Sequence, residues 1–222
     1  ATLLLRHTDA CVKIGGRQPT RASKRMETLS VRFPGRVATV RIDAGDAKAL
    51  THFCRDLDHL VCAAGVWSSY PVLFDSCMET GTALWDLCLS NRSKHRYLHD
   101  REKDVREKGG LVVTDCGFHP GLPAAMIRYA SARIPGMHTA WVGAKMNLPW
   151  KQMAFSKDTR DAFITELSQC ETRYYRLGRW RRDFAFHPMF DFCPIFRECR
   201  CIPLFLEELR SIPASIKTIN NT

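Results

Sequence analysis

Residues 37–64 read VATVRIDAGDAKALTHFCRDLDHLVCAA, and this stretch decides the fold. It holds two short apolar runs, Val37–Ile42 and His59–Ala64, on either side of a segment with helical character. Asp46 is a residue type that caps helix N-termini, so we expect a helix over Ala47–Leu57. Continuous apolar runs of this length are typical of strands that are buried on both faces of a parallel sheet. The stretch therefore predicts one strand–helix–strand unit.

The same unit repeats in both directions along the chain. Further strands are expected at Cys11–Gly15, Ala83–Leu87 and Leu111–Thr114, and further helices at Val72–Glu79, His99–Lys108 and Ala124–Arg133. This alternation predicts an α/β fold with a doubly wound, Rossmann-like parallel sheet. Residues Ala1–Asp9 are interpreted as the rest of its first helix, and no GxGxxG turn occurs in the chain. We therefore expect the first strand and the glycine-rich loop of such a domain to be missing.

The pattern changes after Gly136, where we place a boundary between domains 1–136 and 137–222. A strand is expected at Met137–Lys145, a helix at Asp158–Cys170 and a short helix at Leu204–Ser211. Between the two helices, Arg173–Arg182 interleaves basic and aromatic residues, a pattern that could stack on single-stranded bases. We favour a β-hairpin with inward aromatic side chains, because alternation at period two is common in half-buried strands. Nucleic acid is therefore not the expected partner.

The composition is that of an ordinary globular protein, with 45% hydrophobic and 25% charged residues in 222. No window approaches 18 uncharged apolar residues, so neither a membrane-spanning helix nor a membrane partner is expected. The ten cysteines are scattered through apolar segments, which indicates free thiols and a cytoplasmic location. Cys193, Cys199 and Cys201 lack the spacing of zinc ligands, so no metal is expected. The net charge of +10 is compatible with an anionic ligand.

Ligands of open α/β sheets bind at the carboxyl ends of the strands. The first strand ends in Gly15-Gly16-Arg17, and a small residue followed by arginine favours NADP over NAD. No acidic residue lies between Cys11 and Met26, a segment whose basic residues are Lys13, Arg17, Arg21, Lys24 and Arg25. These charges suit the 2′-phosphate of NADP. The alternative is a solvated basic loop.

Three further segments follow strand ends. Asp43 follows the second strand, and Ala63, Ala64 and Gly65 lie at the end of the third. These small residues would let a flat cofactor approach the backbone, although close packing of a helix on the strand also selects them. After the last strand come Cys116 and His119, which could supply proton transfer near a nicotinamide. A buried thiol with a solvated histidine is the alternative.

Together these segments resemble the saccharopine dehydrogenase family and its saccharopine dehydrogenase-like oxidoreductases. The resemblance is carried by residues 15–17, 41–43 with Asp46, 62–65, 82–87, 116–123 and 201–210. The family often has a Cys-Gly-Phe-Asp-Pro-Gly-like segment where this chain has Cys116-Gly-Phe-His119-Pro-Gly. The match extends over nearly the whole chain.

The resemblance implies a Rossmann domain (1–136) that binds NADP and part of an α+β substrate and dimerisation domain (137–222), truncated at both ends. It implies hydride transfer at a C–N bond of a small, amino-acid-derived substrate, and a homodimer in the full-length protein. The implied roles place Gly16 and Arg17 at the 2′-phosphate, Asp43 by the adenine, Ala63, Ala64 and Gly65 along the diphosphate and ribose, and Cys116 and His119 near the nicotinamide. The alternative is a non-catalytic fragment or scaffold that keeps the fold without cofactor binding.

Overall fold

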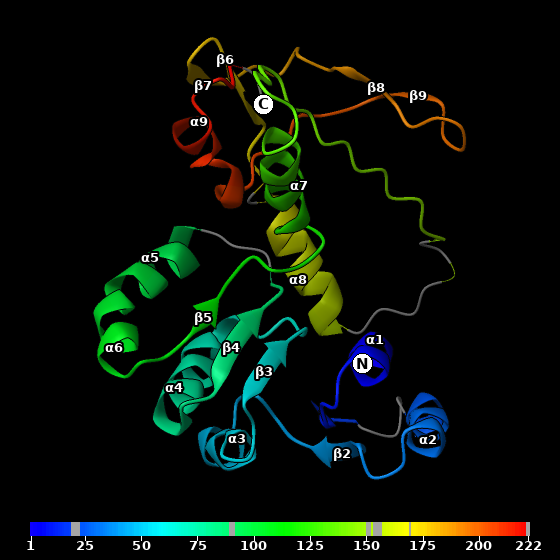
Figure 1. Ribbon diagram of the computed structural model, residues 1–222, viewed down its shortest axis with the longest axis vertical. Helices are drawn as coiled ribbons and strands as arrows, with labels where there is room; N and C mark the ends of the chain where they lie inside the picture. Colours follow the sequence, from blue (N-terminus) through cyan, green and yellow to red (C-terminus); the bar gives the residue numbers. More distant parts are fainter. Residues whose placement is uncertain (19–22, 89–91, 150–151, 153–156, 169, 221–222) are drawn as a thin grey trace. The chain divides into compact units, whose positions relative to one another are not determined.

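The computed structural model describes residues 1–18, 23–88, 92–149, 152, 157–168 and 170–220. Arg21 lies outside these residues, and so do the side chains of Lys24 and Arg25. The chain divides into two compact units. The first unit holds Ala1–Leu60, Val66–Leu84 and Glu107–Leu111, and the second unit holds Val61–Gly65, Trp85–Arg106 and Val112–Thr222. Figure 1 labels their helices and strands.

The first unit begins with a parallel strand pair. Its elements are α1 (Thr2–His7), β1 (Val12–Gly16), α2 (Ser23–Arg32), β2 (Val37–Arg41), α3 (Ala47–Cys54), η2 (Trp67–Ser69) and α4 (Tyr70–Thr80). β1 and β2 run parallel, with Val12 opposite Val37 and Gly16 opposite Arg41. This pairing confirms the parallel arrangement predicted for these two apolar runs.

Local sequence signals set the bounds of α3 and α4. The Asp46 carboxylate accepts a hydrogen bond from the Ala49 backbone N–H at 3.0 Å, so the predicted cap of α3 is confirmed. α4 has a proline in its first turn and ends at Gly81, which adopts φ 76°. The two helices pack through buried side chains, among them Leu50 and Cys54 of α3 and Phe74 and Cys77 of α4.

Arg36 ties the end of α1 to the start of β2. Its guanidinium donates to the carbonyl oxygens of Leu5 at 3.2 Å and of Ala10 at 2.8 Å, and also to that of Thr8. We expect Arg36→Met to lower the free energy of unfolding by about 1–3 kcal/mol, because hydrogen bonds from a charged group are lost. Urea denaturation measures the change. Arg32→Met is the matched control, since the Arg32 and Arg36 guanidinium groups lie over the same Phe33 ring, at 5.6 and 5.8 Å. Equal losses in the two variants would contradict the assigned role.

A second sheet has the strand order β3-β4-β5. Its strands are β3 (His59–Cys62), β4 (Ala83–Asp86) and β5 (Val112–Val113). The Ala83 N–H donates to the Asp58 carbonyl, and the Leu87 N–H donates to the Cys62 carbonyl. The residue numbers of the bonded partners therefore increase in the same direction along β3 and β4, as in a parallel pair. The strands predicted here are confirmed, and residues 61–65, 85–88 and 112–119 at their carboxyl ends belong to the second unit.

The second unit also holds a helical part and two hairpins. Its elements are α5 (Arg92–Asp100), α6 (Glu102–Glu107, whose last residue belongs to the first unit), α7 (Leu122–Ser131), α8 (Lys157–Ser168), β6 (Arg173–Arg176), β7 (Arg179–Arg182), β8 (Met189–Asp191), β9 (Glu198–Arg200), η4 (Glu207–Leu209) and α9 (Ile212–Ser215). Ala124 and Ile127 of α7 form a core with Ile212 and Ile219. None of the helices that the structure describes combines the length and the apolar character needed to cross a bilayer.

The basic and aromatic segment forms the predicted hairpin. β6 and β7 pair antiparallel, with Tyr175 opposite Trp180. Leu177 and Gly178 at the turn both have positive φ, 52° and 77°, as in a type I′ turn. The Tyr175 and Trp180 side chains are half-buried and meet edge to face at 5.4 Å between ring centroids. The aromatic side chains are thus used in packing.

Three predicted elements are wrong. His99–Lys108 is not one helix, because the chain turns at Arg101, whose N–H donates to Leu98 three residues back, between α5 and α6. Met137–Lys145 is not a strand. The His138 carbonyl accepts a hydrogen bond from the Asn220 N–H. Gly143 then lies so close to the Phe190 ring that a Cβ on this glycine would be 2.8 Å from it. Leu204–Ser211 holds only the 3₁₀ turn η4, and α9 starts at Ile212 with a proline in its first turn.

Candidate active site

The loop that follows β5 requires glycine at position 121 and is tightly packed around Gly117. Gly121 has φ 125°, and a Cβ there would lie 2.3 Å from the Asp115 carbonyl oxygen. A Cβ on Gly117 would lie 3.2 Å from the Leu87 carbonyl oxygen, at the end of β4. The loop is therefore pressed against the neighbouring strand end, and this close approach places Cys116 and His119.

Cys116 faces the end of β4. Its N–H donates to the Asp86 carbonyl at 3.1 Å, and its Sγ donates to the same oxygen at 3.2 Å. Burial raises the pKa of the Cys116 thiol, which therefore stays protonated at neutral pH. Cys116 acts here as a hydrogen-bond donor that fixes the loop, and it does not line the pocket described next.

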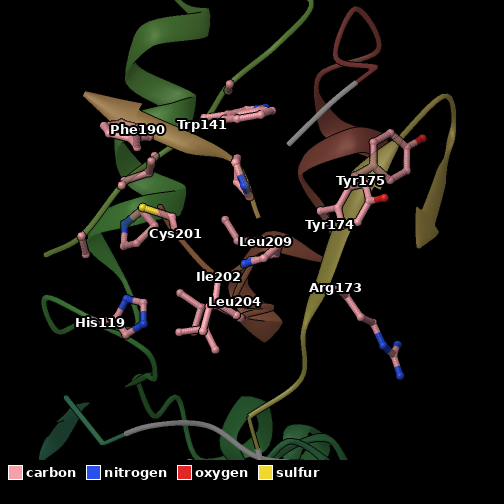
Figure 2. A pocket seen from close by; sticks show the side chains of 18 of the residues that line it. His119, Trp141, Arg173, Tyr174, Tyr175, Phe190, Cys201, Ile202, Leu204 and Leu209 are labelled. Carbon is pink, nitrogen blue, oxygen red and sulfur yellow. The ribbon is translucent and has the colours of Figure 1, made fainter. Parts of the chain in front are cut away.

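His119 lines a pocket of about 1050 Å³ in the second unit. In Figure 2, His119 lies at one side of this pocket, below Cys201 and Phe190, and Tyr174 and Tyr175 lie at the other side. The His119 side chain is exposed, and desolvation by the groups around it still lowers the pKa of its imidazole below the usual value of 6.5. The imidazole is thus neutral at pH 7 and can accept a proton from a molecule in the pocket.

A buried charge cluster holds the strand ends beneath the loop. The Lys94 ammonium contacts the Asp86 carboxylate and lies 3.7 Å from that of Asp115, and all three side chains are less than 10% exposed. It also donates to the Cys88 carbonyl at 3.0 Å. Asp86 in turn accepts hydrogen bonds from the Cys88 N–H at 2.7 Å and the Thr114 hydroxyl at 3.2 Å. Sequence reasoning missed this cluster, because Lys94 lies in a polar segment with no apolar pattern.

Glu208 supports the loop from the other side. Its carboxyl group lies beside the backbone of Gly121 and Ala124 at the start of α7, and burial raises its pKa. A negative charge near the start of α7, which has no side-chain cap, is favourable for the helix dipole. Glu208 was not singled out in the sequence. Its only signal is its place in the acidic pair Glu207-Glu208 after an apolar run.

The fold agrees with that of a known dehydrogenase. No protein-family model matches the chain, and no curated protein matches it in sequence. Among solved structures, an apo, histidine-tagged saccharopine dehydrogenase (L-Glu forming) from Saccharomyces cerevisiae matches with a TM-score of 0.65. The two chains are 14% identical, and the match covers 99% of this chain and 50% of that chain.

This match shows a structural relationship to a saccharopine dehydrogenase. With the parallel strands, it confirms the predicted Rossmann-like α/β fold class. The chain spans about half the length of the matched structure. At this level of identity the likeness shows the fold, and the activity needs arguments from the site itself.

The predicted cofactor residues fall into two groups. In the first unit, Gly16 ends β1, its carbonyl accepts from the Ile42 N–H at 3.1 Å, and exposed Arg17 follows. Asp43 lies at the same edge, where its carboxylate accepts from the Gly45 N–H at 3.0 Å. In the second unit, Ala63–Gly65 follow β3 and are exposed, and the Ala64 carbonyl accepts hydrogen bonds from Cys62 Sγ and Cys88 Sγ at 3.6 and 3.1 Å.

The edge at β1 has open space beside the backbone at Gly16. A Cβ on Gly16 would meet no atom within 4 Å, so space is open beside the backbone there, whereas a Cβ on Gly15 would lie 2.8 Å from Ile42. Gly15 is thus small for packing, and Gly16 leaves room for a ligand. The exposed Arg17 follows Gly16 at this strand end.

Proposed function

We propose that this chain is part of an NADP-dependent oxidoreductase of the saccharopine dehydrogenase-like kind, with NAD as the weaker cofactor. It would transfer a hydride at a C–N bond of an amino-acid-derived substrate in the cytoplasm. The observation that carries this proposal is a neutral histidine in the wall of a large pocket, on the loop that follows a parallel strand of a dehydrogenase-like fold. Residues 1–136 would hold the cofactor and 137–222 part of the substrate domain.

His119 would manage the proton of the reaction. Oxidation of a secondary amine, R₂CH–NHR′, to an imine, R₂C=NR′, releases one hydride and one proton. The neutral imidazole of His119 accepts this proton, and returns it when the reaction runs toward the amine. The lowered pKa of His119 keeps its proton-accepting form populated at pH 7.

The cofactor, when bound, supplies the nicotinamide that takes or gives the hydride. Gly16 and Arg17 would hold its 2′-phosphate, Asp43 would lie by the adenine, and Ala63, Ala64 and Gly65 would line the diphosphate and ribose. The exposure of Ala63–Gly65 supports this role, because close packing does not account for small residues that remain open to solvent. Cys116 would keep the loop, and with it His119, at its place by the nicotinamide.

The preference for NADP is tested at Arg17. We expect NADPH to bind more tightly than NADH, and Arg17→Ala to narrow the difference in binding free energy by about 1–3 kcal/mol, as a charged hydrogen-bond donor is removed. Calorimetric titration of the full-length protein that contains this chain measures both affinities. Arg6→Ala, an exposed arginine of α1, is the control and should leave the difference unchanged. Equal binding of the two nucleotides before the change would rule out the NADP assignment.

The same titration decides on the alternative function. The alternative is a scaffold that keeps the fold without binding the cofactor. A scaffold would bind neither nucleotide, whereas the oxidoreductase binds at least one.

A further inference from the structure

The wall of the pocket is mostly apolar and aromatic. It comprises Phe118, Trp141, Met146, Ile202 and further side chains from β6 to η4. Phe118 is 70% exposed, Met146 65% and Ile202 67%, so these side chains are not satisfied by packing within the chain. Others are locked in place: Phe186 lies 4.3 Å from Tyr174 and 6.1 Å from Trp141 between ring centroids. The pocket therefore offers a preformed surface for an apolar group.

The charges on this wall have one sign. The titratable side chains that line the pocket include His119, Lys145, Arg173, Arg176 and Arg200, and no aspartate or glutamate is found among the described lining residues. Arg173 is paired with Glu171 at 2.6 Å. For Lys145, Arg176 and Arg200, no carboxylate partner occurs in the part of the chain that the structure describes. The pocket thus carries an excess of positive charge.

Lys145 is the cation best placed to meet a ligand. Its Nζ lies 3.0 Å from Cys199 Sγ and 4.8 Å from the centroid of the Phe196 ring. These contacts hold the ammonium at the pocket wall without neutralising its charge. An anionic group of a ligand would complete its hydrogen bonds.

We infer that this pocket binds an N-substituted amino acid whose substituent is aromatic or bulky and apolar. The apolar substituent would lie on the Trp141 and Phe186 side, and the carboxylate would meet Lys145. A charged substituent on the Trp141 and Phe186 side would be buried against aromatic rings, which costs free energy. That the bound molecule is also oxidised rests on the proposed function. Its binding in the pocket needs no cofactor and can be tested separately.

Two dyes of the same shape test the binding separately from turnover. Anilinonaphthalene sulfonate carries an anionic group on an aromatic body, and N-phenyl-1-naphthylamine has that body without the charge. We expect the sulfonate to bind at least tenfold more tightly. Lys145→Met should weaken sulfonate binding about tenfold and leave the neutral dye unaffected, while Trp141→Ala should weaken both. Lys217→Met, an exposed lysine outside the pocket, should change neither.

Competition then identifies the ligand class. N-benzylalanine should displace the sulfonate dye from the full-length protein, and glutamate should not. Equal affinities of the two dyes, no effect of Lys145→Met, or displacement by glutamate alone would overturn the inference. If N-benzylalanine binds but is not oxidised with NADP⁺, the proposed function fails while this binding site stands.

Discussion

Replacing His119 by glutamine is expected to lower kcat for amine oxidation by about 10²–10⁴-fold, the usual contribution of a positioned general base. Glutamine keeps the approximate size and polarity of the side chain but cannot take up a proton at the pH of the assay. The measurement is NADPH formation by the full-length protein with an N-substituted amino acid. KM should change little, because the imidazole is proposed to accept the proton, whereas Lys145 is proposed to bind the substrate carboxylate.

The pH profile separates a base from a side chain that only fills space. Because desolvation lowers the pKa of His119 below 6.5, the imidazole is mostly neutral at pH 7. The rate should therefore be flat near pH 7 and fall on the acid side as the imidazole takes up a proton. This acid limb should vanish in His119→Gln, and His119→Asp should restore part of the rate with the limb moved to lower pH.

His138→Gln provides the control for these variants. His138 is an exposed histidine of the same unit, and it does not line the pocket. Its replacement should leave kcat and the profile unchanged. An unaltered acid limb in His119→Gln would show that another group accepts the proton, and the role of His119 would have to be given up.

Much of the fold could be predicted because its signals are local. Val37–Ile42 and His59–Ala64 are continuous apolar runs, and Asp46 marks a helix start. These signals do not depend on residues far away in the chain. The hairpin within Arg173–Arg182 was predicted in the same way, from alternation at period two. Met137–Lys145 is also apolar, but a strand needs a neighbouring strand whose backbone groups are available for pairing. After His138 this segment lies against the Phe190 ring instead.

The site could be predicted only in part, for the same reason. His119 was found because it follows a strand end, a position that the topology singles out. The rest of its pocket comes from segments between 118 and 209 that meet only through tertiary packing. Lys94 gave no signal at all, since a lysine in a polar helix ordinarily points to solvent, and only the meeting of Asp86 and Asp115 makes it a buried partner.

This buried lysine leads to the largest expected effect on stability. Lys94→Met should lower the free energy of unfolding by about 3–5 kcal/mol, because its removal leaves the buried Asp86 carboxylate without its cation. Asp115, in contrast, keeps the His95 imidazole at 3.5 Å. The Lys94 side chain is 3% exposed and that of Asp86 is fully buried, so water cannot take over the contact. Methionine fills nearly the same volume, which assigns the loss to charge and not to a cavity. Lys217→Met, at an exposed position, should cost little.

A double variant tests this cause directly. Adding Asp86→Asn to Lys94→Met removes the stranded charge, and the amide oxygen can still accept from the Cys88 N–H. The double variant should therefore be more stable than Lys94→Met alone, although each change by itself is destabilising. Urea denaturation of all four proteins gives the coupling free energy between the two side chains. Additive losses would mean that Lys94 and Asp86 stabilise the strand ends independently, and the charge cluster would no longer explain how the His119 loop is held in place.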